Sequence, residues 1–421
     1  MAANSDVRNM ALNTVGETVW GFKTGLVASV TVLTVLLRDH GASERLIGVV
    51  GGLETGAMLI PQLLGARLFA SRRRRRVHMI LWHVLVILPF LLAMGVLTLH
   101  APRLAPAVYR WLMVAGHSGF CLAIGVANAA WIDFVAHLVS MRRRGTAMGL
   151  ALAGSAFAGT GGSLAAGWAI GRFSGTRPFA AMYMGAWLLG TLAMTLWLPV
   201  DDRALRVDAG PDRLPFLQLL ARFKASVSEG NFRAYLIGRI LAALGFCILP
   251  FIALHYRSDA GGALPASVVV ACGAALTFGT ACGSLLLGRL GDRAGHRWGM
   301  LVGAGTQIGT LLVLLLVSGV NGCVVAYGAA GVCVACGQVS HYNMILETCP
   351  HEHHVAHISV GNLIVGVPML LAPVAAGFIA GHIGLRAVFG ACLVPSAAAL
   401  LWFVVKVKEP RTLPVIQART G

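Results

Sequence analysis

Charged side chains are scarce in this chain of 421 residues: 12% are Asp, Glu, Lys or Arg, whereas 57% are hydrophobic. A typical soluble domain carries about 25% charged and about 45–50% apolar residues. So little charge cannot cover a surface that faces water on all sides. The composition therefore excludes an ordinary soluble protein.

Other absences narrow the class further. The N-terminal stretch MAANSDVRNM lacks a basic region and a cleavage site, so we expect the first apolar segment to stay as a membrane anchor. The nine cysteines lie almost entirely within apolar segments, which argues against a disulfide framework. No Walker-type phosphate loop and no nucleophile–base spacing occur. We therefore expect neither an enzyme nor an ATP-driven pump, and no cofactor.

The chain instead contains a series of apolar segments, each long enough to cross about 30 Å of hydrocarbon. They predict an all-α membrane protein with twelve transmembrane helices in two pseudo-symmetric six-helix halves. The expected helices of the first half are 10–37, 44–70, 77–99, 107–138, 145–172 and 178–199. Those of the second half are 232–256, 264–290, 298–319, 322–348, 355–382 and 385–406.

These segments divide the chain into an N-terminal bundle (1–200), a central loop (201–231) and a C-terminal bundle (232–421). Within the loop, apolar residues follow the i, i+3, i+4, i+7 spacing of an amphipathic helix, which we expect to lie on the membrane surface. The residues with this spacing are Phe216, Leu219, Leu220 and Phe223.

The net charge of +17 is concentrated in short clusters between apolar segments, chiefly Arg72–Arg76 and Arg142–Arg144. These clusters lack interleaved aromatic residues, so we expect no nucleic-acid partner. Placing both termini in the cytoplasm leaves 23 basic residues inside and 8 outside, which follows the positive-inside rule. We expect a multi-pass monomer in the cell membrane, the inner membrane in a bacterium.

The two predicted halves repeat each other in sequence. Gly125 and Gly149 are 24 residues apart, as are Gly337 and Gly361, and the offset between matching positions stays at 210 to 212. Internal repeats of this kind are typical of transporters in which one half rocks against the other around a central site.

The loop after the eighth expected helix contains a motif, Gly288-Arg-Leu-Gly-Asp292-Arg293-Ala-Gly295-His-Arg297. It resembles the G-x-L-x-D-R-x-G-R-[RK] loop signature of the major facilitator superfamily. The resemblance implies a cavity surrounded by helices 1, 4, 7 and 10, and a gating role for Gly288, Asp292, Arg293, Gly295 and Arg297. Gly288 would allow a close helix approach, Gly295 a tight turn, and Asp292 a latch with the start of helix 5.

The first half departs from this signature, because Ala70 stands where the family has a carboxylate. The facing segment at the start of helix 11 contains His351, His353, His354 and His357. We favour a solvated cytoplasmic loop for these histidines, with metal binding as the alternative. Cys333 and Cys336 are expected to serve helix packing.

Ionisable residues within membrane spans are costly and usually face a cavity or a partner. Glu17 is the foremost candidate for coupling, with a structural carboxylate at the membrane edge as the alternative. Lys23 is expected to point away from the Glu17 stripe, and Glu54 to lie off the main cavity. The candidate residues for substrate binding and coupling are Asn13, Glu17, Trp20, His117, Asn128, Arg239, Gln338 and His341.

The favoured function is a secondary active transporter that moves a small solute by alternating access, with protons as a candidate coupling ion. A transition-metal transporter that uses the His-rich loop is one alternative, and a non-transporting receptor is another. The expected partners are a small-molecule substrate and the lipid bilayer. The sequence leaves the cargo and the direction of transport open.

Replacing His353 and His354 with Gln is expected to change the pH profile of transport. Protonated histidines at this position would repel Arg72–Arg76 and favour opening to the inside. Transport by reconstituted protein over a pH series measures this effect, and an unchanged profile in the double variant contradicts the idea.

Overall fold

The computed structural model describes residues 2–70, 75–139, 141–201, 227, 230–348 and 354–412. The described chain is helical, without a strand, and its helices form twelve successive segments. The first six segments are α1 (Ala2–Leu26) with η1 (Ser29–Leu33) and α2 (Thr34–Asp39), α3 (Glu44–Gly56) with α4 (Gln62–Ala70), α5 (Arg75–Trp82) with η2 (His83–Ile87) and α6 (Leu88–Leu99), α7 (Pro106–His137), α8 (Met141–Arg172) and α9 (Arg177–Thr195). The other six are α11 (Gly230–Gly245) with α12 (Leu249–Arg257), α13 (Ala266–Ala294), α14 (His296–Leu316), α15 (Gly319–Thr348), α16 (His354–Ile383) and α17 (Leu385–Val405).

The predicted all-α membrane fold is confirmed. Apart from the start of the first helix, the expected helix ends agree with the observed ones to within four residues. In the described part of the chain, nine helical segments are long and apolar enough to cross a membrane. The amphipathic helix expected in the central loop lies outside the described residues.

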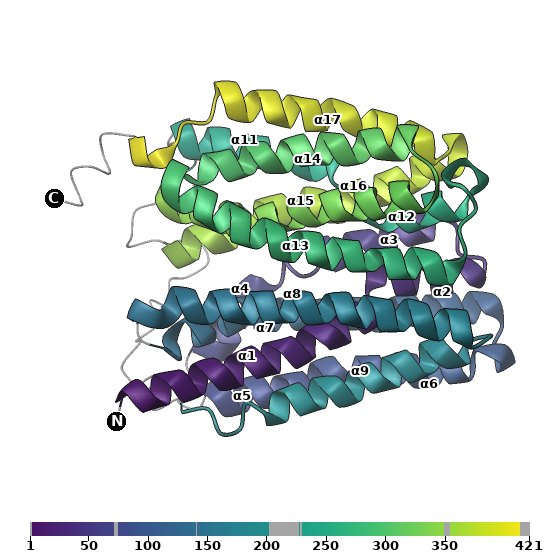
Figure 1. Cartoon of the computed structure of the whole chain (residues 1–421), viewed down its shortest axis with the longest axis horizontal. Coiled ribbons are helices and arrows are strands. Elements are labelled where there is room, and N and C mark those ends of the chain that lie inside the picture. The colour runs from purple at the N-terminus through teal and green to yellow at the C-terminus, as the bar shows by residue number, and fades with distance from the viewer. Residues whose placement is uncertain are drawn as a thin grey trace.

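The two halves form two bundles that lie side by side, with both termini at the same end of the molecule (Figure 1). We name this end the terminal end, and the opposite end, which carries the turn between α2 and α3, the far end. Contacts between the halves occur toward the far end. There Gly48 of α3 faces the carbonyl of Pro373 on α16, and Gly167 of α8 faces Ser267 and Ala271 on α13.

Three of the helical segments are interrupted partway along their length. The first is broken at Val27–Ala28, the second at Ala57–Pro61 and the seventh at Phe246–Ile248. Pro61 ends the second break, and Pro250 begins the helix after the third. Irregular backbone at membrane depth is tolerated only where protein or a cavity surrounds it, so these breaks mark the interior of the bundle.

Glycine backbones hold the first helix tightly against the fifth. A Cβ atom on Gly21 would lie 2.0 Å from the Ser155 carbonyl oxygen, and one on Gly25 would lie 2.0 Å from that of Gly159. Gly162 of α8 faces the carbonyl of Phe22 in the same way. Small residues permit such close approach, which is a main source of helix association in lipid.

The Gly21→Ala variant is therefore expected to lose about 1–3 kcal/mol of stability, because α1 and α8 must move apart to accommodate the methyl group. Thermal unfolding in detergent would show a lowered midpoint. Gly149→Ala is the matched control, because nothing lies within 4 Å of a Cβ at that position of α8. Equal midpoints for the two variants would contradict the tight packing of α1 on α8.

Candidate substrate and coupling site

A pocket within the first half collects predicted residues from the first and fourth helical segments. Glu17 and Trp20 line it from α1, and Asn128 and Trp131 line it from α7. The remaining wall residues are Gly16, His83, Ile124, Ala127, Met194 and Trp197. The 100° helical spacing that groups Glu17 with Trp20 in the sequence therefore corresponds to one shared surface in the structure.

Glu17 is surrounded by aromatic rings in this pocket. The indole Nε1 of Trp131 donates a hydrogen bond of 3.1 Å to Glu17 Oε1. The ring of Trp131 lies 4.0 Å from that of Trp197 and 5.2 Å from that of His83, measured between centroids. A single carboxylate with aromatic walls suits a ligand that is cationic or presents a hydrogen-bond donor.

Lys23 does not point away from this region as the helical spacing predicts. Its side chain is 1% exposed, and its Nζ lies 3.6 Å from the centre of the Trp20 ring. It interacts electrostatically with both Glu17 and Glu54. The four-carbon stem of lysine carries the ammonium group around the helix, so the direction of its Cβ alone gives a wrong placement.

Glu54 lies at the seam between the two halves and not off the cavity. It lines a pocket with Val30, Gly51 and Thr55 from the first half and Phe246, Pro250, Met369 and others from the second. Phe246 belongs to the break in the seventh helical segment, and Val30 comes two residues after the break in the first, so this pocket lies close to both breaks. The expectation for Glu54 was wrong because the glycine face of α3, with Gly48, Gly51 and Gly52, lets the second half approach closely.

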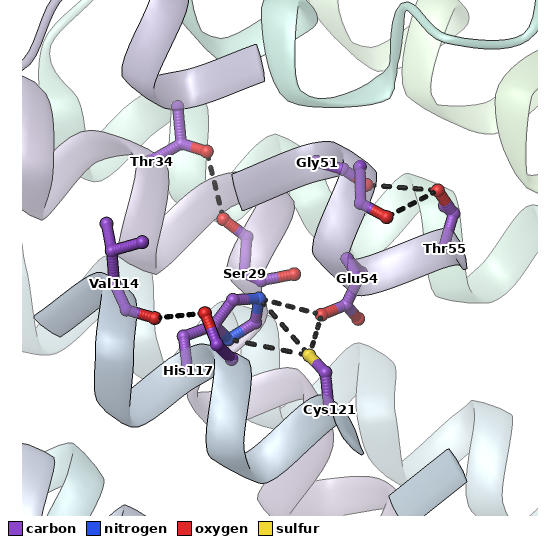
Figure 2. A network of polar contacts seen from close by, with 10 residues as sticks. Ser29, Thr34, Gly51, Glu54, Thr55, Val114, His117 and Cys121 are labelled. Atoms are coloured by element: carbon purple, nitrogen blue, oxygen red, sulfur yellow. Dashed lines mark hydrogen bonds and ion pairs between the residues drawn. The ribbon is translucent and has the colours of Figure 1, made fainter. Parts of the chain in front are cut away.

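His117 is buried on α7 and contacts Glu54. Its Nε2 lies 3.3 Å from Glu54 Oε2, and the sulfur of Cys121 lies beside both groups (Figure 2). The predicted residue His117 therefore belongs to a cluster next to the seam and not to the pocket of Glu17.

The second half carries its own buried polar cluster. His341 Nδ1 is hydrogen-bonded to the hydroxyl of Tyr235, and His341 Nε2 lies 3.2 Å from Asn362 Oδ1. Asn362 Nδ2 donates to Gln62 Oε1 across the seam at 3.0 Å, and both amides are buried. The four side chains thus link α11, α15 and α16 of one half to α4 of the other.

The remaining predicted residues are dispersed. Arg239 is half-buried, its Nε has no hydrogen-bond partner among the described residues, and it interacts electrostatically with His341. Asn13 is buried, and within the described chain neither of its amide atoms has a hydrogen-bond partner. Gln338 is exposed. The predicted set therefore falls into a pocket in one half and clusters at the seam and in the other half.

The loop motif of the second half contacts the end of the chain. Gly295 has a positive φ of 91°, and a Cβ there would lie 2.1 Å from the Glu409 carboxyl carbon. The same carboxylate accepts a hydrogen bond of 3.0 Å from the backbone N–H of Arg297. Arg411 donates to the carbonyl of Asp292. Asp292 and Arg293 are both exposed.

Gly288 has nothing within 4 Å of a Cβ position, so it does not provide a close helix approach in this conformation. Gly279 of the same helix does so instead, because a Cβ there would lie 2.3 Å from the Gly328 carbonyl oxygen. The side chains of Arg142–Arg144, the predicted partners of Asp292, lie outside the described residues.

Cys333 and Cys336 contact α14 through separate hydrogen bonds, Cys333 to the Gly303 carbonyl and Cys336 to the Gly299 carbonyl. This arrangement is helix packing. His351 and His353 lie outside the described residues, as do the side chains of His354 and His357.

The cross-seam amide bond gives a prediction. Replacing Asn362 with Ala removes one hydrogen-bond partner each from Gln62 and His341, which is expected to cost about 1–3 kcal/mol because buried polar atoms lose a bond that water cannot replace. Thermal unfolding in detergent measures the loss. Asn343→Ala is the control, because within the described chain the Asn343 side chain bonds the Val339 carbonyl of its own helix. A loss as large in that variant contradicts the special role of Asn362.

Comparison with known proteins agrees with this architecture. Residues 235–420 match the family model described as Major Facilitator Superfamily. No curated protein sequence matches the chain.

A bacterial homologue of the human lysosomal transporter Spinster, in an inward-facing and unoccupied conformation, is similar in structure, with a TM-score of 0.69, 14% identity and 97% of each chain covered. The nucleoside transporter NupG aligns with a TM-score of 0.68 and 13% identity over 96% of this chain and 100% of its own. The second half of the chain, which carries the loop motif, therefore matches the Major Facilitator Superfamily model, and both halves together share the fold of these solved transporters.

Proposed function

We propose that this protein is a secondary active transporter that moves a small organic solute across a membrane by alternating access, coupled to protons through Glu17. One observation carries the proposal: ionisable residues lie inside an apolar bundle, with Glu17 in a pocket of the first half and Lys23 and Glu54 close to breaks in its helices. Charged groups inside a membrane are expensive and mark substrate or ion pathways. Discontinuous helices are the usual binding elements of secondary transporters.

The arrangement of the halves supports alternating access. The seam is closed at the far end, where Arg257 Nη1 lies 2.6 Å from Asp39 Oδ1, and Arg45 lies 3.1 Å from a ring nitrogen of His382. Each of these pairs joins one half to the other. The positive-inside rule assigns the terminal end to the cytoplasm, so a seam closed at the far end supports an inward-facing state.

Glycine and amide contacts along the same seam would have to separate when the far end opens. Gly48 lies against Pro373, and the Thr55 hydroxyl donates to the Met369 carbonyl at 2.8 Å. Closer to the terminal end, Asn362 bonds Gln62 across the seam. These contacts are separate from one another and lie at different levels along α3, α4 and α16. They can therefore break in turn as one half rocks against the other.

Proton coupling through Glu17 follows from its surroundings. The carboxylate has a Trp131 hydrogen bond and the charge of Lys23 to stabilise it, and aromatic rings around it. A proton bound to Glu17 neutralises the carboxylate and removes the cost of holding a charge in this apolar pocket. A solute that is cationic or donates a hydrogen bond offsets the same cost by pairing with the carboxylate. A solute and a proton would therefore compete for the same carboxylate.

Ligand binding by purified protein in detergent tests the proposal. The panel should contain organic acids, amino acids, sugars, nucleosides and organic cations, each at acidic and basic pH. A ligand at 100 times its dissociation constant stabilises a protein by about 2.7 kcal/mol. We expect one organic class to raise the unfolding midpoint more strongly at basic pH, because there the proton no longer occupies Glu17.

Glu17→Gln is expected to remove both that shift and its pH dependence, and to abolish solute movement driven by a pH gradient in proteoliposomes. The control is Asp259→Asn, because Asp259 is an exposed carboxylate in the turn at the far end. Wild-type binding and gradient-driven transport that survive Glu17→Gln would refute the role of Glu17, and a protein that moves none of these solutes would refute transport of a small organic compound.

A further inference from the structure

Glu54 on α3 and His117 and Cys121 on α7 bring three different ligand atoms together. Glu54 Oε2 lies 3.3 Å from His117 Nε2 and 3.6 Å from Cys121 Sγ, and the sulfur lies 3.4 Å from the same imidazole nitrogen (Figure 2). Each atom thus contacts both others and the three form a closed triangle. In the part of the chain that the structure describes, no other three His, Cys, Asp or Glu side chains come together as closely.

We propose that Glu54, His117 and Cys121 form a binding site for a divalent transition-metal ion of the Zn²⁺ class. This inference is independent of the proposed transport of an organic solute. It also differs from metal binding by the His-rich loop, because its ligands lie in the membrane-spanning part of the first half.

The size of the triangle fits a tetrahedral metal ion. Zinc binds sulfur at about 2.3 Å, imidazole nitrogen at about 2.0–2.1 Å and carboxylate oxygen at about 2.0–2.2 Å, so tetrahedral angles put ligand atoms roughly 3.3–3.6 Å apart. The three observed separations fall in this range. An ion at the common centre would therefore need little rearrangement of the side chains.

The backbone fixes the triangle from two helices. His117 and Cys121 are four residues apart on α7, so both side chains lie on one face of that helix. Glu54 belongs to the segment of α3 that the glycines Gly51 and Gly52 hold against the second half, and Thr55 next to it bonds the Gly51 and Met369 carbonyls. The ligands are thus positioned by helix packing and not by a loop.

One coordination position is left for an exchangeable ligand. The side chain of His117 is 5% exposed, whereas that of Glu54 is 30% exposed and lines the pocket at the seam. Three protein ligands with an open fourth position are typical of metal sites that bind water or substrate. The open position here would face the pocket between the halves.

The charges also balance. A carboxylate, a thiolate and a neutral imidazole around a divalent ion sum to zero, which lowers the cost of burial in an apolar surrounding. Lys23 and Glu17, which interact electrostatically with each other, add no net charge when both are ionised. Binding would release the thiol proton of Cys121, and also a proton from His117 if the imidazole is charged beforehand.

Titration of the full-length protein in detergent with Co²⁺ tests the site, because Co²⁺ takes the place of Zn²⁺ and reports its ligands in its absorption spectrum. We expect a near-ultraviolet thiolate-to-cobalt band and the visible bands of a tetrahedral ion, saturating at one ion per chain. Zn²⁺ is expected to displace both sets of bands and to raise the unfolding midpoint.

Cys121→Ser is expected to abolish the thiolate band, and His117→Gln to abolish saturation at one ion per chain. Cys336→Ser is the matched control and should keep the spectrum, because this cysteine is also buried but lies in the second half, on the side of α15 that packs on α14. Gel filtration shows whether a variant folds. If a ligand variant does not fold, the cobalt spectrum of the wild-type protein, compared with that of the control, decides whether a thiolate binds the ion. A wild-type protein without the thiolate band, or a band that survives Cys121→Ser, overturns the proposal.

Discussion

Inside hydrocarbon, a polar group that finds no partner costs several kcal/mol, and the rest of this structure depends on how that cost is met. The helix break at Phe246–Ile248 lies at the pocket on the seam, and the break at Val27–Ala28 comes just before Val30, which lines the same pocket. The ionisable residues Glu17, Lys23 and Glu54 interact with one another in the first half. The described interior of the bundle is therefore polar at the seam, near the helix breaks and in the pocket of Glu17.

The contacts that join the halves differ from those inside each half. Within the first half, Gly21 and Gly25 bring α1 against α8 by direct backbone contact, to which the Ser163 hydroxyl adds a hydrogen bond of 3.4 Å to the Gly25 carbonyl. Along the seam, glycine contacts such as Gly48 on Pro373 alternate with hydrogen bonds such as Thr55 to Met369 and Asn362 to Gln62. A seam of this kind can separate, because polar groups that part there can bond water in an opened cavity. The proposed metal site lies beside that seam, whereas the pocket of Glu17 lies within the first half.

The sequence predicts the helices well because a span of hydrocarbon demands a long apolar run, and each run is visible in the chain. It also predicts that Glu17 and Trp20 share a surface, since the helical angle between them is fixed. It does not predict the place of Glu54, because that depends on how closely α3 and α16 approach. The hydrogen bond between Asn362 and Gln62, which connects His341 to the first half, joins residues 300 positions apart in the sequence. No local sequence pattern predicts such a contact. Pro61 and Pro250 were the available signals for two of the breaks.

The central claim is that the seam closes at one end of the molecule while it opens at the other. Distances between spin labels in reconstituted protein test it most directly, with one pair at the far end (Arg103 and Val320) and one at the terminal end (Leu150 and Trp298), all exposed positions on opposite halves. Cys282, which is partly exposed, and Cys349 would first be replaced with Ser. The account predicts that a change of pH or the addition of a bound solute shifts the two distances in opposite directions. Distances that stay fixed, or that lengthen together, would contradict it.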